Sequence, residues 1–420
     1  MDILNILKYG LEIVDDSLTT KELIDQLVSI GPLQEPLHLT ELDNVVKRHY
    51  QWLRHLPRVH PYYTVRSNND ARILGTTVLL DCGYICSSKA EVMQIMELGV
   101  EPEWILLKDA AKTTELLKFA RRKRLTVVFE HEQELRQIHQ HYPEAEILVR
   151  FGFNTDSSLE HDSHIKTHEL LNIARDLELD VIGWCFNGGA SFRHNDGVVY
   201  EAIRKGREIS DFALILGFNF RFINLEASFT GEQDNELQEY STRINRALAE
   251  FFPDRWNLTV TAESGPFLSA AAVTAVSAIH GKRVFWHRQF PSQIDRVFYY
   301  LNHDIGGDQG QKQIKPIIWK SLTDCGAVCQ SSLFASSNEC MLENLPLPEV
   351  NEMDFFVFEN QGASLSDLTE LQCTPIVLVF VRKSMWDFLE TLSVSNHPKT
   401  CILSSQYLQR VAKIERLRFE

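Results

Sequence analysis

Eight short runs of β-forming residues alternate with amphipathic segments between about residues 60 and 265, and this alternation limits the possible fold more than any other feature. The runs cover residues 62–65, 83–86, 104–107, 125–129, 147–151, 181–186, 222–225 and 258–261. The amphipathic segments include residues 90–98, 114–124 and 168–179. Eight strand–helix units of this kind predict an α/β fold, a (β/α)8 TIM-type barrel. A doubly wound sheet is the competing interpretation.

The pattern changes after about residue 270. The strand-like runs that follow have fewer helices between them and cover residues 283–287, 297–301, 355–359 and 376–381. We therefore expect a separate β-rich domain in the C-terminal part of the chain.

The composition is that of an ordinary globular protein, with 44% hydrophobic and 24% charged residues among 420. A formal net charge of −15 argues against a nucleic-acid partner, because phosphate contacts need a basic surface. The eight cysteines do not have zinc-like spacing, so we expect reduced thiols and no metal site. Without a signal-like N-terminus or an 18-residue apolar run, we expect a cytoplasmic protein that does not engage a membrane.

Several sequence blocks in a fixed order are characteristic of one family. They are Pro61–Asn68 (PYYTVRSN), Cys86–Glu91 (CSSKAE), Ala262–Gly265 (AESG), Phe298–Asn302 (FYYLN) and Phe358–Ala363 (FENQGA). Through these blocks the chain resembles eukaryotic ornithine decarboxylase and its non-catalytic relative, the antizyme inhibitor, from about residue 30 to residue 395. The resemblance implies an alanine-racemase-like barrel at residues 36–270. It also implies a β-sheet domain formed by residues 271–420 and completed by the N-terminal residues 1–35.

The family's chemistry needs a lysine that forms a Schiff base with pyridoxal phosphate, and the resemblance places Arg66 at this position. A guanidinium group stays protonated and is not a nucleophile toward an aldehyde at neutral pH. Lysine serves in this role because burial can lower its pKa and free the amine. We therefore expect no catalysis and no bound cofactor.

The glycine loop that holds the cofactor phosphate in the family is also lost. The corresponding stretch contains Glu226, Ala227 and Ser228, and the arginine of the Glu-Pro-Gly-Arg motif is replaced by Pro266. Glycines there allow backbone N–H groups to approach a phosphate. At about 4 Å and an effective dielectric constant near 20, the carboxylate of Glu226 would repel each unit of phosphate charge by about 4 kcal/mol.

Other family positions differ as well. The ring-stacking histidine falls on Asn187, a phosphate-contacting serine falls on Ala190, and the acidic residue of the second strand falls on Ile85. Further changed positions, all assigned by the resemblance, are His303, Asp324, Cys325 and Ser364. Losing this many functional positions together indicates a pseudoenzyme.

Two site positions keep the family's residue, namely Arg150 and Glu263, whose family counterpart contacts the pyridine nitrogen. Each has an alternative interpretation as a member of a buried ion pair, because a partner for the pyridine nitrogen has no use without the cofactor.

The segment 112–124 holds six basic residues and one acidic residue, which is unusual in a chain of net charge −15. Alone, it is typical of a solvated helix C-terminus, where cations interact favourably with the helix dipole. The resemblance aligns it with the element by which the family binds antizyme. We expect antizyme contacts at Lys89, Lys118, Arg121, Arg122, Lys123 and Arg124.

Three functions stay open. The first is a decoy that binds antizyme, releases active ornithine decarboxylase and so raises polyamine synthesis. The second is an inactive regulatory subunit that pairs with a catalytic decarboxylase, and the third is a decarboxylase with altered chemistry. The family's dimer-holding loop is not visible at residues 157–164, so we expect a monomer or a weak dimer.

Overall fold

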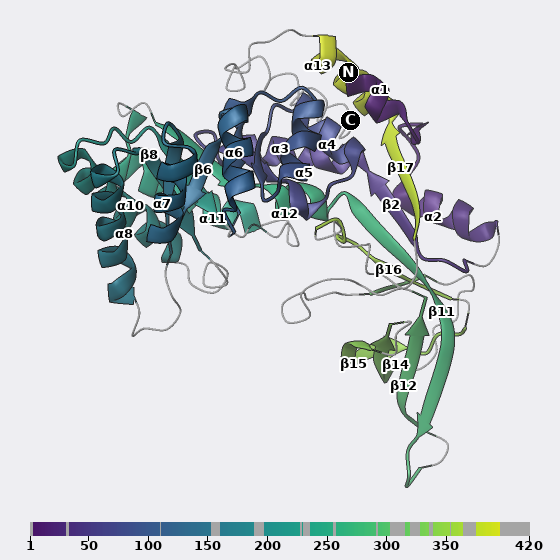
Figure 1. Cartoon of the computed structure of the whole chain (residues 1–420). Coiled ribbons are helices and arrows are strands. Elements are labelled where there is room, and N and C mark those ends of the chain that lie inside the picture. Colours follow the sequence, from purple (N-terminus) through teal and green to yellow (C-terminus); the bar gives the residue numbers. More distant parts are fainter. Residues whose placement is uncertain are drawn as a thin grey trace. The chain divides into compact units, whose positions relative to one another are not determined.

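The computed structural model describes residues 3–30, 33–109, 111–152, 160–188, 197–226, 229, 236–254, 258–290, 293–302, 316–319, 328–335, 339–352, 354–363 and 375–394. The chain divides into two compact units (Figure 1). Unit 1 is built mainly from Val45–Leu268, and unit 2 from Lys8–Asn44 and Ser269–Glu390.

The strands of unit 1 close into a parallel barrel, so the predicted TIM-type barrel is confirmed. The strands follow one another around the barrel in chain order, and β10 pairs with both β9 and β3. They are β3 (His60–Thr64), β4 (Gly83–Cys86), β5 (Ile105–Leu107), β6 (Thr126–Phe129), β7 (Glu146–Gly152), β8 (Asp180–Asn187), β9 (Phe222–Glu226) and β10 (Thr259–Glu263).

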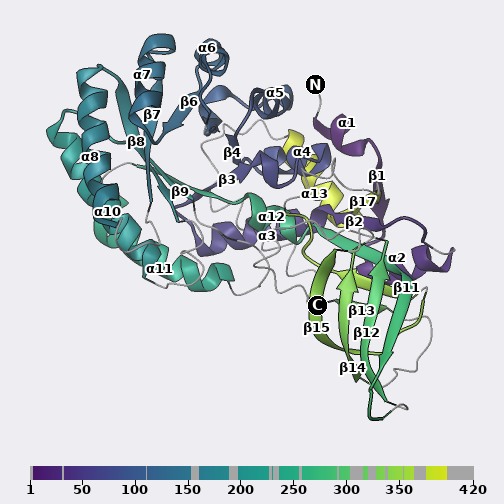
Figure 2. The same cartoon turned by 60° about the horizontal axis from the view of Figure 1, so that its bottom comes forward.

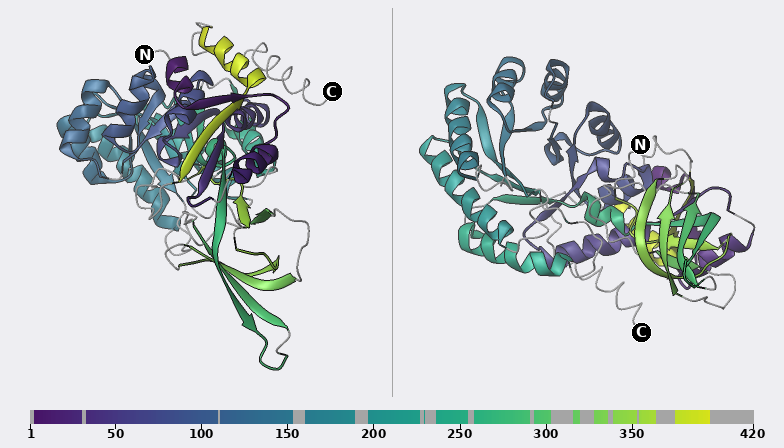
Figure 3. Two further views of the ribbon diagram at one scale, coloured as in Figure 1. Left: turned by 90° about the vertical axis from the view of Figure 1, so that its right-hand side faces the viewer. Right: turned by 90° about the horizontal axis from the view of Figure 1, so that it is seen from below.

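Helices follow the barrel strands and form an outer layer around them (Figure 2; Figure 3, right). They are α4 (Ala71–Leu79), α5 (Lys89–Glu97), α6 (Thr114–Lys123), α7 (Glu132–His141), α8 (Glu160–Asp176), α10 (Val198–Ile215), α11 (Glu236–Phe251) and α12 (Gly265–Ala270). Helix α3 (Leu42–His55) precedes the first barrel strand, and the short helices η1 (Val65–Ser67) and η2 (Pro102–Trp104) lie within unit 1.

The barrel strands are apolar because both of their faces are covered. All residues of β4, β5 and β6 are buried, as expected for parallel strands between a barrel interior and a helix layer. The barrel interior contains a packed cluster with one or two residues from most strands. Its buried members are Tyr62, Ile85, Leu106, Val128, Leu148, Ile182 and Cys185.

Unit 2 is a mixed sheet with the strand order β1-β17-β2-β11-β12-β14-β15, and β16 pairs with β11 and β13 (Figure 3, left). The strands are β1 (Leu11–Val14), β2 (Leu37–Glu41), β11 (Val273–Trp286), β12 (Ile294–Leu301), β13 (Ile317–Trp319), β14 (Val328–Phe334), β15 (Cys340–Pro348), β16 (Phe355–Phe358) and β17 (Ile376–Arg382). The remaining helices are α1 (Ile3–Lys8), α2 (Thr20–Ser29) and α13 (Lys383–Val394).

The N-terminal segment completes the sheet of unit 2, as expected. Strands β1 and β2 both pair in parallel with β17, and β2 also pairs with β11. The ion pair between Arg382 and Glu41 joins the C-terminal strand to this N-terminal segment. Because β2 belongs to this sheet, the sheet unit includes residues up to Asn44. The expected boundaries, 36–270 for the barrel and 1–35 with 271–420 for the sheet domain, stay a prediction.

Within the described residues, no helix combines the length and apolar character needed to span a bilayer. The five cysteines among these residues, Cys82, Cys86, Cys185, Cys329 and Cys340, are free thiols.

Candidate functional site: a charged cavity at the carboxyl ends of the barrel strands

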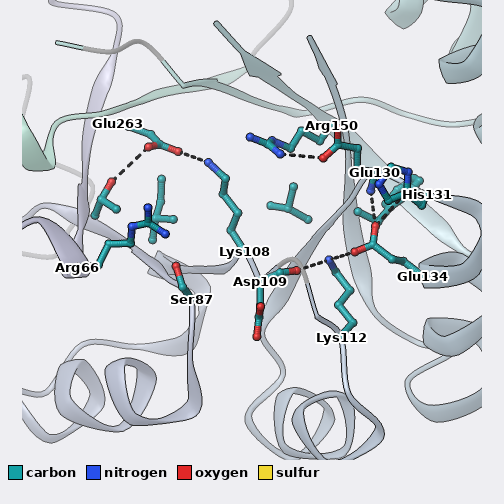
Figure 4. A pocket seen from close by; sticks show the side chains of 14 residues that line it. Arg66, Ser87, Lys108, Asp109, Lys112, Glu130, His131, Glu134, Arg150 and Glu263 are labelled. Atoms are coloured by element: carbon teal, nitrogen blue, oxygen red, sulfur yellow. Dashed lines mark hydrogen bonds and ion pairs between the residues drawn. The ribbon is translucent and has the colours of Figure 1, made fainter. Parts of the chain in front are cut away.

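A cavity of about 330 Å³ opens at the carboxyl ends of the barrel strands, which is where barrel folds place their functional sites. Its lining comes from the ends of β3, β4, β5, β6, β7 and β10 and from the loops that follow them (Figure 4). The charged residues of the lining are Arg66, Lys108, Asp109, Lys112, Glu130, Glu134, Arg150 and Glu263.

Lys108 lies at the centre of this site, directly after β5. Its Nζ atom is 2.7 Å from Oε2 of Glu226 and 2.7 Å from Oε1 of Glu263. Figure 4 shows the Lys108 side chain directed toward Glu263. The side chain of Lys108 is 23% exposed and that of Glu226 only 6%, so these charges interact with little screening by water.

Arg150 binds the same glutamate from the other side. Its Nε atom is 2.8 Å from Oε1 of Glu226, and its second terminal nitrogen is 2.8 Å from Oε2, a bidentate arrangement. Its first terminal nitrogen is 2.7 Å from Oε2 of Glu130. The buried Cys185 thiol donates to Oε1 of Glu226 over 2.9 Å. The carboxylate of Glu226 is therefore held by a lysine, an arginine and a thiol.

This pairing shifts the ionisation of each group. Burial lowers the pKa of Lys108, but the carboxylates of Glu263 and Glu226 outweigh it and raise the pKa above its usual value. Burial raises the pKa of Glu226, but Lys108 and Arg150 together bring it below its usual value. Burial, with the nearby charge of Glu226, leaves the pKa of Glu263 raised although Lys108 opposes the shift. Lys108 is thus an ammonium ion at neutral pH.

The second lysine of the cavity, Lys112, is also engaged. Its Nζ atom donates to Oε1 of Glu134 over 2.5 Å and to the backbone oxygen of Asp109 over 2.7 Å. The other oxygen of Glu134 accepts from the backbone N–H groups of Glu130 and His131 at the start of α7. Lys112 therefore anchors the β5–α6 loop to α7, and it is buried, so it does not contribute to a basic surface as the sequence pattern of residues 112–124 implied.

The other site positions assigned from the sequence are placed as follows. Arg66 lies in η1 and lines the cavity, and Ile85 is buried in the barrel interior and also lines it. Asn187 ends β8, and Pro266 lies in α12. Ala190, Ala227, Ser228, His303, Asp324, Cys325 and Ser364 lie outside the described residues, as do residues 157–159 of the expected dimer loop.

Arg150 and Glu263 are ion-pair members, which is the alternative that the sequence left open. Sequence reasoning missed Lys108, and it also missed Glu130 and Glu134. The sequence did contain a signal for Lys108, because this lysine directly follows the strand-like run 104–107. Residues at the carboxyl ends of barrel strands commonly belong to the functional site.

The described residues that line the cavity do not fit pyridoxal phosphate. Arg66 cannot supply a neutral amine, and both lysines of the cavity lining are bound in ion pairs. The guanidinium of Arg150, the retained cation on β7, already holds the carboxylate of Glu226. Contrary to the expectation from the sequence, the carboxylate of Glu226 is therefore neutralised by its partners and is not a bare charge. Glu226 would still oppose phosphate binding, because it pairs with Lys108 and Arg150, the cations that could bind a phosphate.

A basic surface lies at the C-terminal end of α6. Thr113 caps the start of this helix, and the apolar face of Leu116, Leu117 and Phe119 is buried, which turns the charged residues outward. Lys118 pairs with Glu115 at 3.3 Å, and Arg121 pairs with Glu144 at 2.6 Å. The members are Lys89, Lys118, Arg121, Arg122, Lys123 and Arg124, and all except the half-buried Lys123 are exposed.

Within this surface, Lys89 lies over the ring of Phe119 at 5.4 Å, which joins the start of α5 to α6. Arg122 and Lys123 have no ion-pair partner among the described residues, so their charges are available to an acidic partner.

Comparison with known proteins places this geometry in a family. Residues 42–270 match the family described as pyridoxal-dependent decarboxylase, pyridoxal binding domain. The chain is 26% identical to ornithine decarboxylase of Rattus norvegicus over 421 residues, covering 93% of this chain and 91% of that protein. It is also 26% identical to antizyme inhibitor 1 of Pongo abelii over 379 residues, covering 84% of each.

A solved structure supports the fold. Arginine decarboxylase of Paramecium bursaria Chlorella virus, bound to agmatine, superposes with a TM-score of 0.76 at 23% identity, over 86% of this chain and all of that one. Together with the family match over more than half of the sequence, these relatives show that the chain belongs to the ornithine decarboxylase family of pyridoxal-dependent decarboxylases.

Proposed function

We propose that this protein is a non-catalytic member of its family that regulates polyamine synthesis by binding antizyme and so releasing active ornithine decarboxylase. The observation that supports this proposal best is the state of the cavity's cationic side chains. Arg66 stands at the family's lysine position, and Lys108 is held between two carboxylates. A Schiff base requires a neutral amine, and the paired Lys108 does not offer one at neutral pH.

If Lys108 had taken over the role of the catalytic lysine, its surroundings would have to lower its pKa. Active-site lysines act as nucleophiles where burial or neighbouring cations lower the pKa. Lys108 has carboxylates on both sides, and they raise its pKa instead. This argues against a decarboxylase with altered chemistry that uses this residue.

The likeness to antizyme inhibitors and the basic surface of α6 together favour antizyme as the partner. An exposed cluster of cations on a chain of net charge −15 would attract an acidic surface and orient the encounter. We further propose that the protein acts in the cytoplasm as a monomer or weak dimer.

The proposal is tested by titrating the full-length protein against antizyme, with the double charge reversal Arg122→Glu and Lys123→Glu as the variant. These two positions have no ion pair among the described residues, so reversal removes partner contacts without breaking a described pair inside the protein. We expect affinity to fall by about tenfold or more, and wild-type binding to weaken as salt is raised.

The matched control reverses Arg54 and Arg288, two exposed arginines outside α6 with no ion pair among the described residues. This control should bind antizyme as the wild type does, and both variants should keep the wild-type melting temperature within about 2 °C. If wild-type protein captures a catalytic decarboxylase and not antizyme, the heterodimer alternative replaces the proposal. If neither binds, the regulatory role is wrong.

A further inference from the structure

We propose that two side chains of this protein have permanently replaced the charges of the family's cofactor: the carboxylate of Glu226 stands in for the phosphate, and the ammonium group of Lys108 stands in for the protonated pyridine ring. The barrel would then contain a built-in ionic ligand. The inference deepens the proposed non-catalytic function and rests on its premise that the site holds no pyridoxal phosphate.

Glu226 provides the negative charge that would replace the phosphate. Glu226 ends β9, at the start of the stretch that the resemblance assigns to phosphate binding. Its two oxygens receive two guanidinium nitrogens of Arg150 at 2.8 Å each. A fork of parallel N–H donors is the geometry in which arginine holds either a carboxylate or a phosphate. The guanidinium of Arg150 therefore has an anionic partner within the protein and needs no bound phosphate.

Lys108 provides the positive charge that would replace the protonated pyridine ring. Glu263 ends β10, and its family counterpart faces a pyridine nitrogen that carries a proton. Here its Oε1 atom faces Nζ of Lys108 at 2.7 Å, while Oε2 accepts from the hydroxyl of Thr64 at 3.3 Å. Lys108 also reaches Glu226, so the two substitutes are joined to each other at 2.7 Å.

The charges of this group are mutually dependent. Two glutamates, the buried Glu226 and the partly buried Glu263, face two cations, Lys108 and Arg150. The side chain of Glu226 is only 6% exposed, so water can do little to replace a missing partner there. Breaking a buried pair by removing one partner leaves an uncompensated charge and is strongly destabilising. A stand-in for a ligand has a specific signature, because deleting it should create a site for a small molecule of the same charge.

The experiment is chemical rescue of Glu226→Ala, followed by thermal unfolding of the full chain. The variant should melt about 10 °C below the wild type. Rising sodium formate, and separately inorganic phosphate, should raise its melting temperature, because either anion can bind the released Arg150. Sodium chloride at matched ionic strength should have no such effect, and the wild type should respond to none of the three.

The double variant Glu226→Ala with Arg150→Met is the specificity control. It should lose the response to formate and phosphate, and its melting temperature should lie above the value expected from adding the two single losses. A response that survives without Arg150 would show that the anions bind elsewhere and would overturn the assignment of Glu226. So would a Glu226→Ala protein that folds and ignores both anions.

A second variant keeps the test decisive if Glu226→Ala does not fold. Lys108→Met leaves the partly buried Glu263 without its ion-pair partner, and such a carboxyl has a folded-state pKa above its unfolded value. Its lost stability should therefore return as pH is lowered from about 8 toward 5, where Glu263 can take up a proton. A loss of stability that is independent of pH would contradict the role of Lys108. Both tests are read from stability, so they succeed or fail independently of antizyme binding.

Discussion

At the scale of single residues, we expect two histidines, the buried His49 and the partly buried His60, to make the stability of the barrel depend on pH. His60 begins β3, its Nε2 atom is buried, and its ring lies 5.2 Å from Trp104 and 5.8 Å from Tyr62. Burial lowers the pKa of His60 to about 4 although a hydrogen bond to the backbone of Asp81 opposes the shift. Burial also lowers the pKa of His49, to about 3.

The sign of the effect follows from these directions. Above about pH 6.5 both histidines are neutral whether the chain is folded or unfolded. Below it the unfolded chain binds protons that the folded barrel rejects, so stability falls as pH decreases toward 4. For His60 the loss is at most about 3 kcal/mol. In melts recorded from pH 7 to pH 5, His60→Asn should show a smaller decrease than the wild type; equal decreases would contradict the assignment.

The residues of the site could be predicted only in part. Arg66, Arg150, Glu226 and Glu263 were identified because each occupies a recognisable position in a sequence block. Their pairing could not be predicted, because Lys108 and Glu263 are 155 residues apart and only closure of the barrel brings them together. The ion pair of Lys112 could not be predicted for a related reason: the pattern shows a lysine near a helix start, and not the glutamate of α7 that binds it.

At the scale of elements, α6 ends at a residue whose conformation is strained. Arg124 has φ 57° and ψ 44°, in the left-handed region that favours glycine, and its N–H group bonds to the backbone oxygens of Ala120 and Arg121. Arg124→Gly should therefore stabilise the protein by up to about 1 kcal/mol. Arg122→Gly is the matched control within the helix and should cost about 1 kcal/mol. Differential scanning calorimetry of both variants checks this, and a loss of stability in both would contradict it.

Most elements of the barrel could be predicted because parallel strands covered on both faces give continuous apolar runs. All eight runs correspond to strands, with ends that differ by at most two residues. Unit 2 was harder. The run 283–287 marks only the end of the 14-residue β11. The role of β2 at the centre of the sheet depends on pairing with β11 and β17, which are distant in sequence.

At the scale of the whole molecule, the barrel fold of the family is retained, and the charged side chains in its cavity form ion pairs with one another. Lys108 and Arg150, at the carboxyl ends of the strands, are bound to the chain's own glutamates. A cluster of exposed and half-buried cations, including Arg122 and Lys123 without an ion pair among the described residues, lies at the C-terminal end of α6. This distribution agrees with the binding role proposed above, since fold alone does not determine function.

The most direct test of this account is a titration of the purified full-length protein with pyridoxal phosphate, followed by absorbance and calorimetry, with rat ornithine decarboxylase as the positive control. The account predicts no saturable binding, no absorbance band from a cofactor–lysine adduct, and no release of carbon dioxide from ornithine. Saturable binding together with a borohydride-trapped lysine adduct, at Lys108 or any other lysine, would contradict it.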